Sequence, residues 1–185
     1  MSDDPTSRRT LGRRHLLAGL VGVGFVGSAV IGGDTIDLGT GSESRLPVEV
    51  STVDATGSTA GRASVPATGT PTVVDCFATW CEPCVRQMDA LGAVHDRYAD
   101  RVAFVSVTNE RFGGGLDREA LRAWWRDNDG RWALGHDPDG SLLAALGADG
   151  LPYLAVTDAS GSIAWSHGGV ASTETLDRRI ASVLS

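Results

Sequence analysis

Lysine is absent from this chain of 185 residues, and all 16 of its basic residues are arginine. The absence excludes a nucleotide-binding phosphate loop, because such a loop places a lysine after its glycines. The glycines at positions 113–115 are therefore interpreted as a flexible connection. Internal repeats are also absent from the sequence, which excludes architectures built from stacked repeat units.

Histidine and cysteine are scarce, with four histidines and three cysteines in the chain. A structural zinc site takes four ligands, commonly two cysteine pairs or a cysteine pair with two histidines. Besides the pair Cys81 and Cys84, only Cys76 and scattered histidines could complete such a set. The histidines are His15, His95, His136 and His167. Zinc is therefore a minor alternative for the pair. Residues 137–140 (Asp-Pro-Asp-Gly) lack the remainder of a calcium loop and predict a turn.

Aspartate supplies 17 of the 23 acidic residues, and the formal net charge is −7. Four arginines and two aspartates give the first 33 residues a charge of +2, which leaves −9 on the remaining 152. An acidic body repels phosphates, so we expect no nucleic-acid partner. An aspartate-rich surface without lysine also fits a high-salt environment, where charge repulsion is screened. The alternative explanation is a GC-rich codon bias.

The amino-terminal residues have the layout of an export signal. Arginine pairs at 8–9 and 13–14 precede residues 16–33, which contain no charged residue, and Arg13-Arg14-His15-Leu16-Leu17 resembles a twin-arginine signal. Eighteen helical residues span about 27 Å, close to a bilayer core of about 30 Å. We therefore expect residues 1–33 to be either an uncleaved membrane anchor, favoured because no Ala-x-Ala site follows, or a cleaved signal. A buried core helix is the remaining alternative.

Residues 34–46 are rich in Gly, Ser and Thr and predict a flexible tether. From residue 47 to residue 185, short apolar runs alternate with helical patterns, which predicts one α/β domain on the outer side of the membrane. Strands are expected at residues 48–53, 62–65, 72–78, 102–107, 152–157 and 162–165. Helices are expected at residues 83–98, 117–127, 141–146 and 173–183.

The apolar spacing predicts which side chains of these elements are buried. Residues 72–78 are almost wholly apolar, as in a central strand buried on both faces. The first helix is expected to bury one face, formed by Val85, Met88, Leu91, Val94 and Tyr98. The second helix is expected to direct Leu121, Trp124 and Trp125 to the core. Gly147 is expected to cap the third helix.

The segment Trp80-Cys81-Glu82-Pro83-Cys84 stands where the buried strand ends and the first helix begins. Cysteines three residues apart in a first helical turn can form a small disulfide ring, and Pro83 fits there because its missing N–H needs no partner. The unpaired amides and the helix dipole favour a thiolate, so Cys81, nearer the open end, is expected to be the nucleophile. Cys84 then supplies the second thiol of a disulfide exchange. A purely structural disulfide is the alternative, although so small a ring constrains little chain.

Residues 74–84 (V-D-C-F-A-T-W-C-E-P-C) resemble the active-site segment of the thioredoxin superfamily, especially of the exported TlpA/ResA-like thiol-disulfide oxidoreductases. The resemblance covers residues 47–185. It implies a thioredoxin-like α/β fold in which helices flank a central mixed β-sheet. It also implies a redox-active Cys81–Cys84 disulfide, with no other cofactor and no metal.

Further site residues carry over from this resemblance. Pro152 matches the cis-proline that packs against the disulfide, and Leu151 precedes it at the backbone that pairs with a substrate; an ordinary trans proline opening a strand is the alternative. Asp75 matches the buried acid that relays the proton of Cys84. Its pKa should be raised by the apolar strand, and the alternative is a structural hydrogen bond. Substrate contacts are expected from Trp80, Glu82, Pro83 and Leu151. Trp80 is expected to shield the sulfurs or simply to pack.

Three positions depart from related patterns. Many ResA-like proteins have glutamate where this chain has Gln87, which places an acid-tuned specificity pocket in doubt. Cys76 lies outside the usual pair and is expected to be an inert buried side chain. Ala78 occupies the position where a peroxidase has threonine, which argues against a peroxidase.

The expected function is the reduction of protein disulfides outside the cytoplasm, with cytochrome c maturation suggested at family level. The resemblance implies a membrane thiol carrier as electron donor, and we expect a monomeric protein. A dithiol oxidase or isomerase uses the same chemistry and differs only in potential. A non-catalytic thioredoxin-fold binding module is the alternative from another class.

Overall fold

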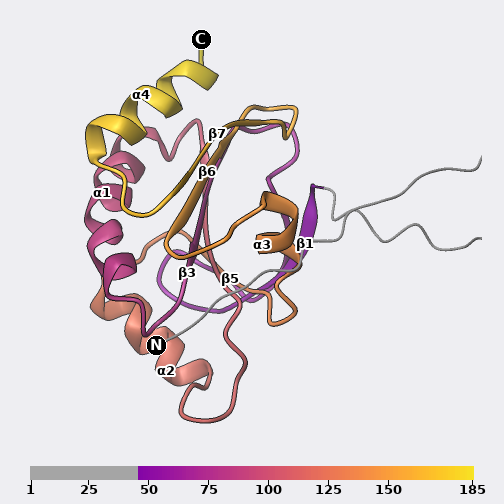
Figure 1. Ribbon diagram of the computed structural model, residues 1–185, viewed down its shortest axis with the longest axis vertical. Coiled ribbons are helices and arrows are strands. Elements are labelled where there is room, and N and C mark those ends of the chain that lie inside the picture. Colours follow the sequence, from indigo (N-terminus) through magenta and orange to yellow (C-terminus); the bar gives the residue numbers. More distant parts are fainter. Residues whose placement is uncertain (1–45) are drawn as a thin grey trace, which may run out of the picture. The chain divides into compact units, whose positions relative to one another are not determined.

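The computed structural model describes residues 46–185, and the predicted export segment and most of the predicted tether lie outside them. Within this range no helix combines the length and the apolar character that crossing a membrane requires. Residues 46–185 form one sheet with helices on both faces (Figure 1).

The sheet has the strand order β2-β1-β5-β4-β3-β6-β7. β3, β4 and β5 run parallel, whereas β1 pairs antiparallel with β2 and β5, and β6 pairs antiparallel with β3 and β7. The predicted mixed sheet is therefore confirmed. The strands are β1 (Val48–Thr52), β2 (Gly61–Val65), β3 (Thr72–Phe77), β4 (Ala103–Thr108), β5 (Ala133–His136), β6 (Tyr153–Thr157) and β7 (Ile163–Gly168).

Between and after these strands, residues 46–185 contain four helices: α1 (Glu82–Tyr98), α2 (Arg118–Asp127), α3 (Ser141–Leu146) and α4 (Thr173–Val183). Buried side chains of α1, α2 and α4 belong to one hydrophobic cluster, and those of α3 belong to a second cluster on the other face of the sheet. Figure 1 shows the same division, with α1, α2 and α4 on one side and α3 beside β1 on the other. β3 lies between the two clusters.

Alternation along β3 decides which residues face α1. Val73 and Phe77 belong to the cluster that includes α1, whereas Val74 and Cys76 belong to the cluster that includes α3. Successive strand side chains point to opposite faces, so Asp75 lies on the α1 side. All six residues of the strand are buried, as predicted.

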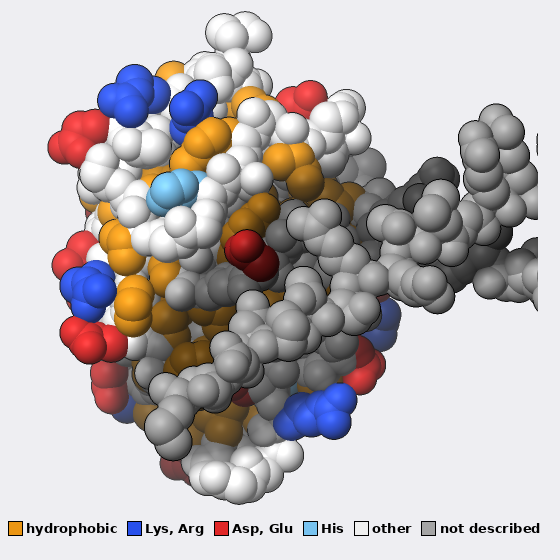
Figure 2. All heavy atoms as spheres, viewed as in Figure 1, with side chains coloured by type: hydrophobic (Ala, Val, Ile, Leu, Met, Phe, Trp, Pro, Cys, Tyr) orange, Lys and Arg blue, Asp and Glu red, His pale blue; other side chains and the backbone are white. Residues whose placement is uncertain are grey.

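α1 and α4 are joined at the edge of the fold. Asp177 of α4 is paired with Arg97 of α1, and Tyr98 donates its hydroxyl to the same carboxylate over 2.9 Å. Along the edge that α1 and α4 occupy, acidic and basic side chains lie close together (Figure 2). These contacts fix the carboxyl end of α1, and the cysteines stand at its other end.

Two details of the sequence interpretation were wrong, and a third needs refinement. β5 was not predicted, because four residues that include a glycine carry little strand signal; pairing with β1 and β4 defines it. Val85 is exposed, because the buried face of α1 starts at Cys84 and continues through Met88 and Leu91. Trp124 faces the core as predicted but is only half-buried there, whereas Leu121 and Trp125 are fully buried.

Candidate active site

Cys81 and Cys84 are joined by a disulfide at the first turn of α1. Cys81 is the N-cap residue, and its Sγ accepts a hydrogen bond of 3.2 Å from the amide of Cys84. Pro83 stands in the first turn, where a missing N–H costs nothing. In the reduced protein the same amide and the helix dipole stabilise negative charge on Cys81.

The two cysteines differ in how far they can be reached. Cys81 is 4% exposed and Cys84 is 1% exposed, so both are buried and Cys81 keeps slightly more accessible surface. Trp80 is 73% exposed and therefore neither packs in the core nor is covered by other residues. Glu82 is also exposed and pairs with Arg86 over 2.8 Å, while Pro83 is half-buried.

The peptide bond between Leu151 and Pro152 is cis, as predicted. β6 begins at Tyr153, which pairs with Cys76, so Pro152 lies level with the carboxyl end of β3, where the chain turns toward Cys81. Pro152 is buried, and the half-buried Leu151 packs against the hydrophobic cluster that contains both active-site cysteines. The sheet register thus brings the cis-proline to the disulfide end of the fold.

Asp75 is buried on the α1 side of the sheet, and its carboxyl group accepts one side-chain hydrogen bond. Ser106 of β4 donates its hydroxyl to Oδ2 over 2.8 Å, and Trp132 donates its indole N–H to the same serine oxygen over 2.9 Å. Oδ1 of Asp75 has no partner, although it is buried. A protonated carboxyl fits these surroundings better than a carboxylate, because one oxygen is left without a donor.

Burial raises the pKa of Asp75 from 3.8 to about 7, and the Ser106 hydrogen bond opposes this shift. The raised pKa was expected from the apolar strand. An acid with a pKa near neutrality can both accept and return a proton at physiological pH. The Ser106 hydrogen bond also supports the alternative in which Asp75 has only a structural role. The geometry therefore permits both a proton relay and a structural hydrogen bond.

Cys76 faces away from the disulfide. It is fully buried in the cluster with Val74 and Leu142, on the α3 side of the sheet, and it is a free thiol. Desolvation strongly raises the pKa of its thiol, with a smaller effect of the nearby Asp75 charge. Burial on the opposite face agrees with an inert side chain.

Gln87 is a fully buried structural residue. Its Nε2 donates to the carbonyl of Ala171 over 3.2 Å, and the amide of Ala171 donates to its Oε1 over 2.7 Å. The side chain therefore ties α1 to the segment before α4. No free carboxylate or amide is left at this position to select a substrate.

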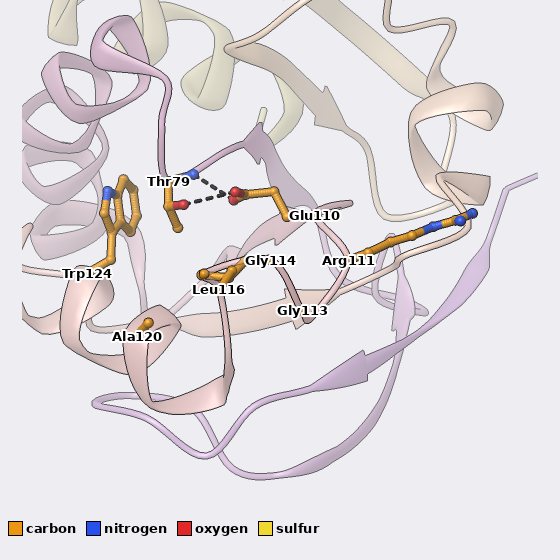
Figure 3. Close-up of a pocket in the computed structure, with 9 residues that line it drawn as sticks. Thr79, Glu110, Arg111, Gly113, Gly114, Leu116, Ala120 and Trp124 are labelled. Atoms are coloured by element: carbon orange, nitrogen blue, oxygen red, sulfur yellow. Dashed lines mark hydrogen bonds between the residues drawn. The ribbon is translucent and has the colours of Figure 1, made fainter.

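A cavity of about 530 Å³ opens beside the chain that leads into Cys81. Trp124, stacked on Phe77 with ring centroids 4.6 Å apart, forms one wall. Thr79 and Glu110 face each other across two hydrogen bonds at another wall (Figure 3). The remaining lining residues are Arg111, Gly113, Gly114, Gly115, Leu116 and Ala120. The three glycines, interpreted from the sequence as a connection, thus border this cavity.

Sequence reasoning missed Ser106, Trp132 and Glu110. Ser106 is the only hydroxyl residue within the apolar run 102–107, at the same position along β4 as Asp75 along β3. Glu110 follows the end of β4, and the carboxyl ends of adjacent parallel strands meet at one edge of a sheet. Those two signals were available. Trp132 carries no comparable signal.

No group of three His, Cys, Asp or Glu side chains able to hold a metal ion is found among residues 46–185.

Residues 42–184 match the model of the Redoxin family. Among solved structures, a secreted Mycobacterium tuberculosis disulfide oxidoreductase homologous to E. coli DsbE is 18% identical, with a TM-score of 0.61 over 77% of this chain and 99% of that chain. StoA from Bacillus subtilis is also 18% identical, with a TM-score of 0.59 over 72% and 97% of the two chains.

The pneumococcal exposed lipoprotein thioredoxin Etrx1 from Streptococcus pneumoniae is 19% identical, with a TM-score of 0.61 over 74% of this chain and 98% of that chain. A search of curated proteins found no match. The resemblance of residues 74–84 to thioredoxin active sites is confirmed by the family match and by the fold. The chain belongs to the Redoxin family and is a thiol-disulfide oxidoreductase of the thioredoxin superfamily.

Proposed function

We propose that this protein reduces disulfides of other proteins outside the cytoplasm through Cys81 and Cys84. The observation that carries the proposal is the Cys81–Cys84 disulfide at the amino end of α1, where Cys81 accepts a hydrogen bond from the Cys84 amide. Trp80 is exposed beside it, and Glu82 and Pro83 occupy the intervening positions. The half-buried Leu151, next to the buried cis-proline Pro152, is a further residue that a substrate would meet.

The first step is an attack on the substrate. The Cys81 thiolate attacks one sulfur of the substrate disulfide, which forms a mixed disulfide with Cys81 and releases the other substrate sulfur as a thiolate that takes up a proton. The helix terminus favours this step by holding Cys81 as an anion. The backbone of Leu151, next to the cis bond, would orient the substrate in this proposal.

The second step releases the substrate. Cys84 loses its proton to the Asp75 carboxylate, through water, and its sulfur attacks Sγ of Cys81. The Cys81–Cys84 disulfide forms, and the second substrate sulfur leaves and is protonated. Two electrons have passed from the dithiol to the substrate disulfide. The only cofactor in this scheme is the cysteine pair, and a thiol donor must reduce it again; a membrane thiol carrier is our proposal for this donor.

An extracytoplasmic location is supported by the basic and apolar pattern of residues 1–33 and by the secreted and exposed proteins that share the fold. We propose that residues 16–33 anchor the protein in the membrane. The alternative is that the signal is cleaved and the protein is secreted. Amino-terminal sequencing of the protein isolated from membrane and soluble fractions distinguishes the two forms.

Single serine variants of each cysteine test the function. Cys81→Ser is expected to abolish insulin reduction with dithiothreitol, because no thiolate attacks. Cys84→Ser is expected to accumulate mixed disulfides with client proteins, visible as bands on gels run without reductant and lost on reduction. Cys76→Ala, on the opposite face, serves as the control and should retain the activity.

Three outcomes would overturn the proposal or its direction. Insulin reduction by Cys81→Ser rejects the mechanism. Partner binding that survives in both serine variants, without exchange in the wild type, indicates a binding module. A reduction potential of the pair close to that of strong oxidants, measured in glutathione buffers, reverses the direction and indicates a dithiol oxidase or isomerase.

A further inference from the structure

A single carboxylate holds the turn that delivers Cys81 to the helix. The turn spans residues 78–81, and the amide of Cys81 donates to the carbonyl of Ala78 over 3.1 Å. Thr79 is the second residue of this turn. Its amide donates to Oε2 of Glu110 over 2.6 Å, and its hydroxyl donates to Oε1 over 2.9 Å (Figure 3). Both donors of Thr79 are therefore satisfied by one side chain.

Glu110 is itself held in place by neighbouring strands. The hydroxyl of Thr108, at the end of β4, donates to Oε2 over 3.1 Å. Nε2 of His136, at the end of β5, lies 2.7 Å from the carbonyl oxygen of Glu110 and donates to it, since a carbonyl can only accept. The His136 ring is stacked on Phe112, with centroids 4.0 Å apart. The carboxylate thus reaches the turn from a rigid support that spans the ends of two strands.

The position of Cys81 depends on this turn. As the N-cap residue, Cys81 must leave the turn with the backbone direction that allows its Sγ to meet the Cys84 amide. If Glu110 were removed, the Thr79 amide and hydroxyl would be left to water, and the turn could adopt other conformations. A reactive group that is displaced by about 1 Å can lose about a hundredfold in rate.

We propose that Glu110 is a positioning residue for Cys81, which acts by fixing the turn through Thr79. Its contribution is the geometry of the two hydrogen bonds, and the negative charge is not required. The benefit to exchange rests on the proposed function, but the positioning itself can be measured on the reduced protein without any substrate.

Glutamine separates geometry from charge at this position. In Glu110→Gln, the side-chain carbonyl can accept from the Thr79 amide and the Thr108 hydroxyl, and the NH₂ group can donate to the Thr79 hydroxyl. Glu110→Ala removes all of these contacts. Asp158→Ala is the matched control, because Oδ1 of Asp158 accepts from the amide and hydroxyl of Ser160 in the β6–β7 turn, at the opposite end of β3.

The experiment measures two properties of these variants, both at temperatures where thermal melts show them folded. The first is kcat/KM for insulin reduction. The second is the rate of Cys81 alkylation by iodoacetamide as a function of pH, measured in the reduced Cys84→Ser background so that only one active-site thiol reacts. Cys76 reactivity is removed in all of them by Cys76→Ala.

Glu110→Ala is expected to lower kcat/KM about tenfold to a hundredfold and to move the alkylation midpoint to higher pH, because the Cys84 amide no longer meets the thiolate. Glu110→Gln should stay within about threefold of the wild type, a margin well below the loss in the alanine variant. Asp158→Ala should change neither property. Thr79→Val should give an intermediate loss that is not additive with Glu110→Ala.

Equal impairment of Glu110→Gln and Glu110→Ala would overturn the proposal in favour of a charge effect. If Glu110→Ala lost no more kcat/KM than Asp158→Ala, and its alkylation midpoint moved no further, the proposal would be overturned and Glu110 would have only a general structural role. If the wild type reduces no protein disulfide at all, the proposed function fails, and the alkylation midpoints still decide whether Glu110 positions Cys81.

Discussion

Gln87 and Ala171 exchange two hydrogen bonds, although 84 residues separate them in the chain. The side-chain amide matches the backbone of Ala171 as a second strand residue would, with one donor and one acceptor. Many ResA-like proteins have glutamate at this position, and here the pairing explains the difference. A carboxylate could accept from the Ala171 amide but could not donate to its carbonyl.

We predict that Gln87→Glu lowers the free energy of unfolding by about 2 to 4 kcal/mol at pH 8, because it buries a charge and leaves the Ala171 carbonyl without a donor. The loss should be smaller at pH 5, where a protonated carboxyl restores the donor. Urea unfolding at the two pH values checks this, with Thr68→Glu at an exposed position as the control. Equal losses at both pH values would contradict it.

Asp75 should make the oxidised protein less stable as pH rises. Its pKa is 3.8 in the unfolded chain and about 7 in the folded one, so between these values the unfolded state binds fewer protons. The contribution of Asp75 to the free energy of unfolding is therefore highest below about pH 4, falls by about 4 kcal/mol up to pH 7, and is then constant. Unfolding in guanidinium chloride from pH 4 to pH 8 should show this slope in the wild type but not in Asp75→Asn. If the unfolding free energies of the wild type and Asp75→Asn changed in parallel with pH, the pKa of Asp75 would not be raised in the folded protein.

The reaction of the Cys76 thiol with a thiol reagent should occur only when the protein unfolds globally. In the oxidised protein it is the free thiol, and burial both blocks access and raises the pKa of the thiol. We expect no reaction with a thiol reagent at pH 8 in the native state and one thiol per chain in denaturant. Rapid labelling of the native protein would mean that the α3 face opens locally without global unfolding.

Trp80 should contribute to protein substrates more than to small ones. Its ring is 73% exposed next to Cys81, where a large aromatic surface can be buried by a partner. Trp80→Ala is expected to raise KM for insulin about tenfold, which corresponds to about 1.4 kcal/mol. Reduction of a small aromatic disulfide should be unaffected. Ile163 is another exposed apolar side chain, on β7, and Ile163→Ala should change neither the KM for insulin nor the reduction of the small disulfide.

The parts of the fold that carry a local signal could be predicted from the sequence. α3 and α4 have the predicted boundaries, and β3 is buried along its whole length, because periodicity and glycine placement record these features. β5 could not be found in this way. Its four residues form a strand only because β1 and β4 supply partners on both sides, and such pairing is not visible in a single short run.

The residues of the candidate site show the same difference between local sequence signals and contacts made by distant segments. The Cys81–Cys84 pairing could be predicted from the spacing of the cysteines at a helix start, and the cis bond at Pro152 from the resemblance to the thioredoxin superfamily. Contacts between distant segments were not predicted, because their sequence signals are weak until the strand register is known. The Asp75–Ser106 and Thr79–Glu110 pairs are each separated by 31 residues, and only the register of β3 against β4 brings them together.

The described chain starts at the end of the sheet that lies away from the disulfide. Leu46 and Pro47 share a cavity with Gly69, which leads into β3, and with Gly161 of the β6–β7 turn. Cys81 follows the other end of β3, whose six residues span about 20 Å. The chain therefore enters the described domain at one end of the central strand and presents its reactive sulfur at the other.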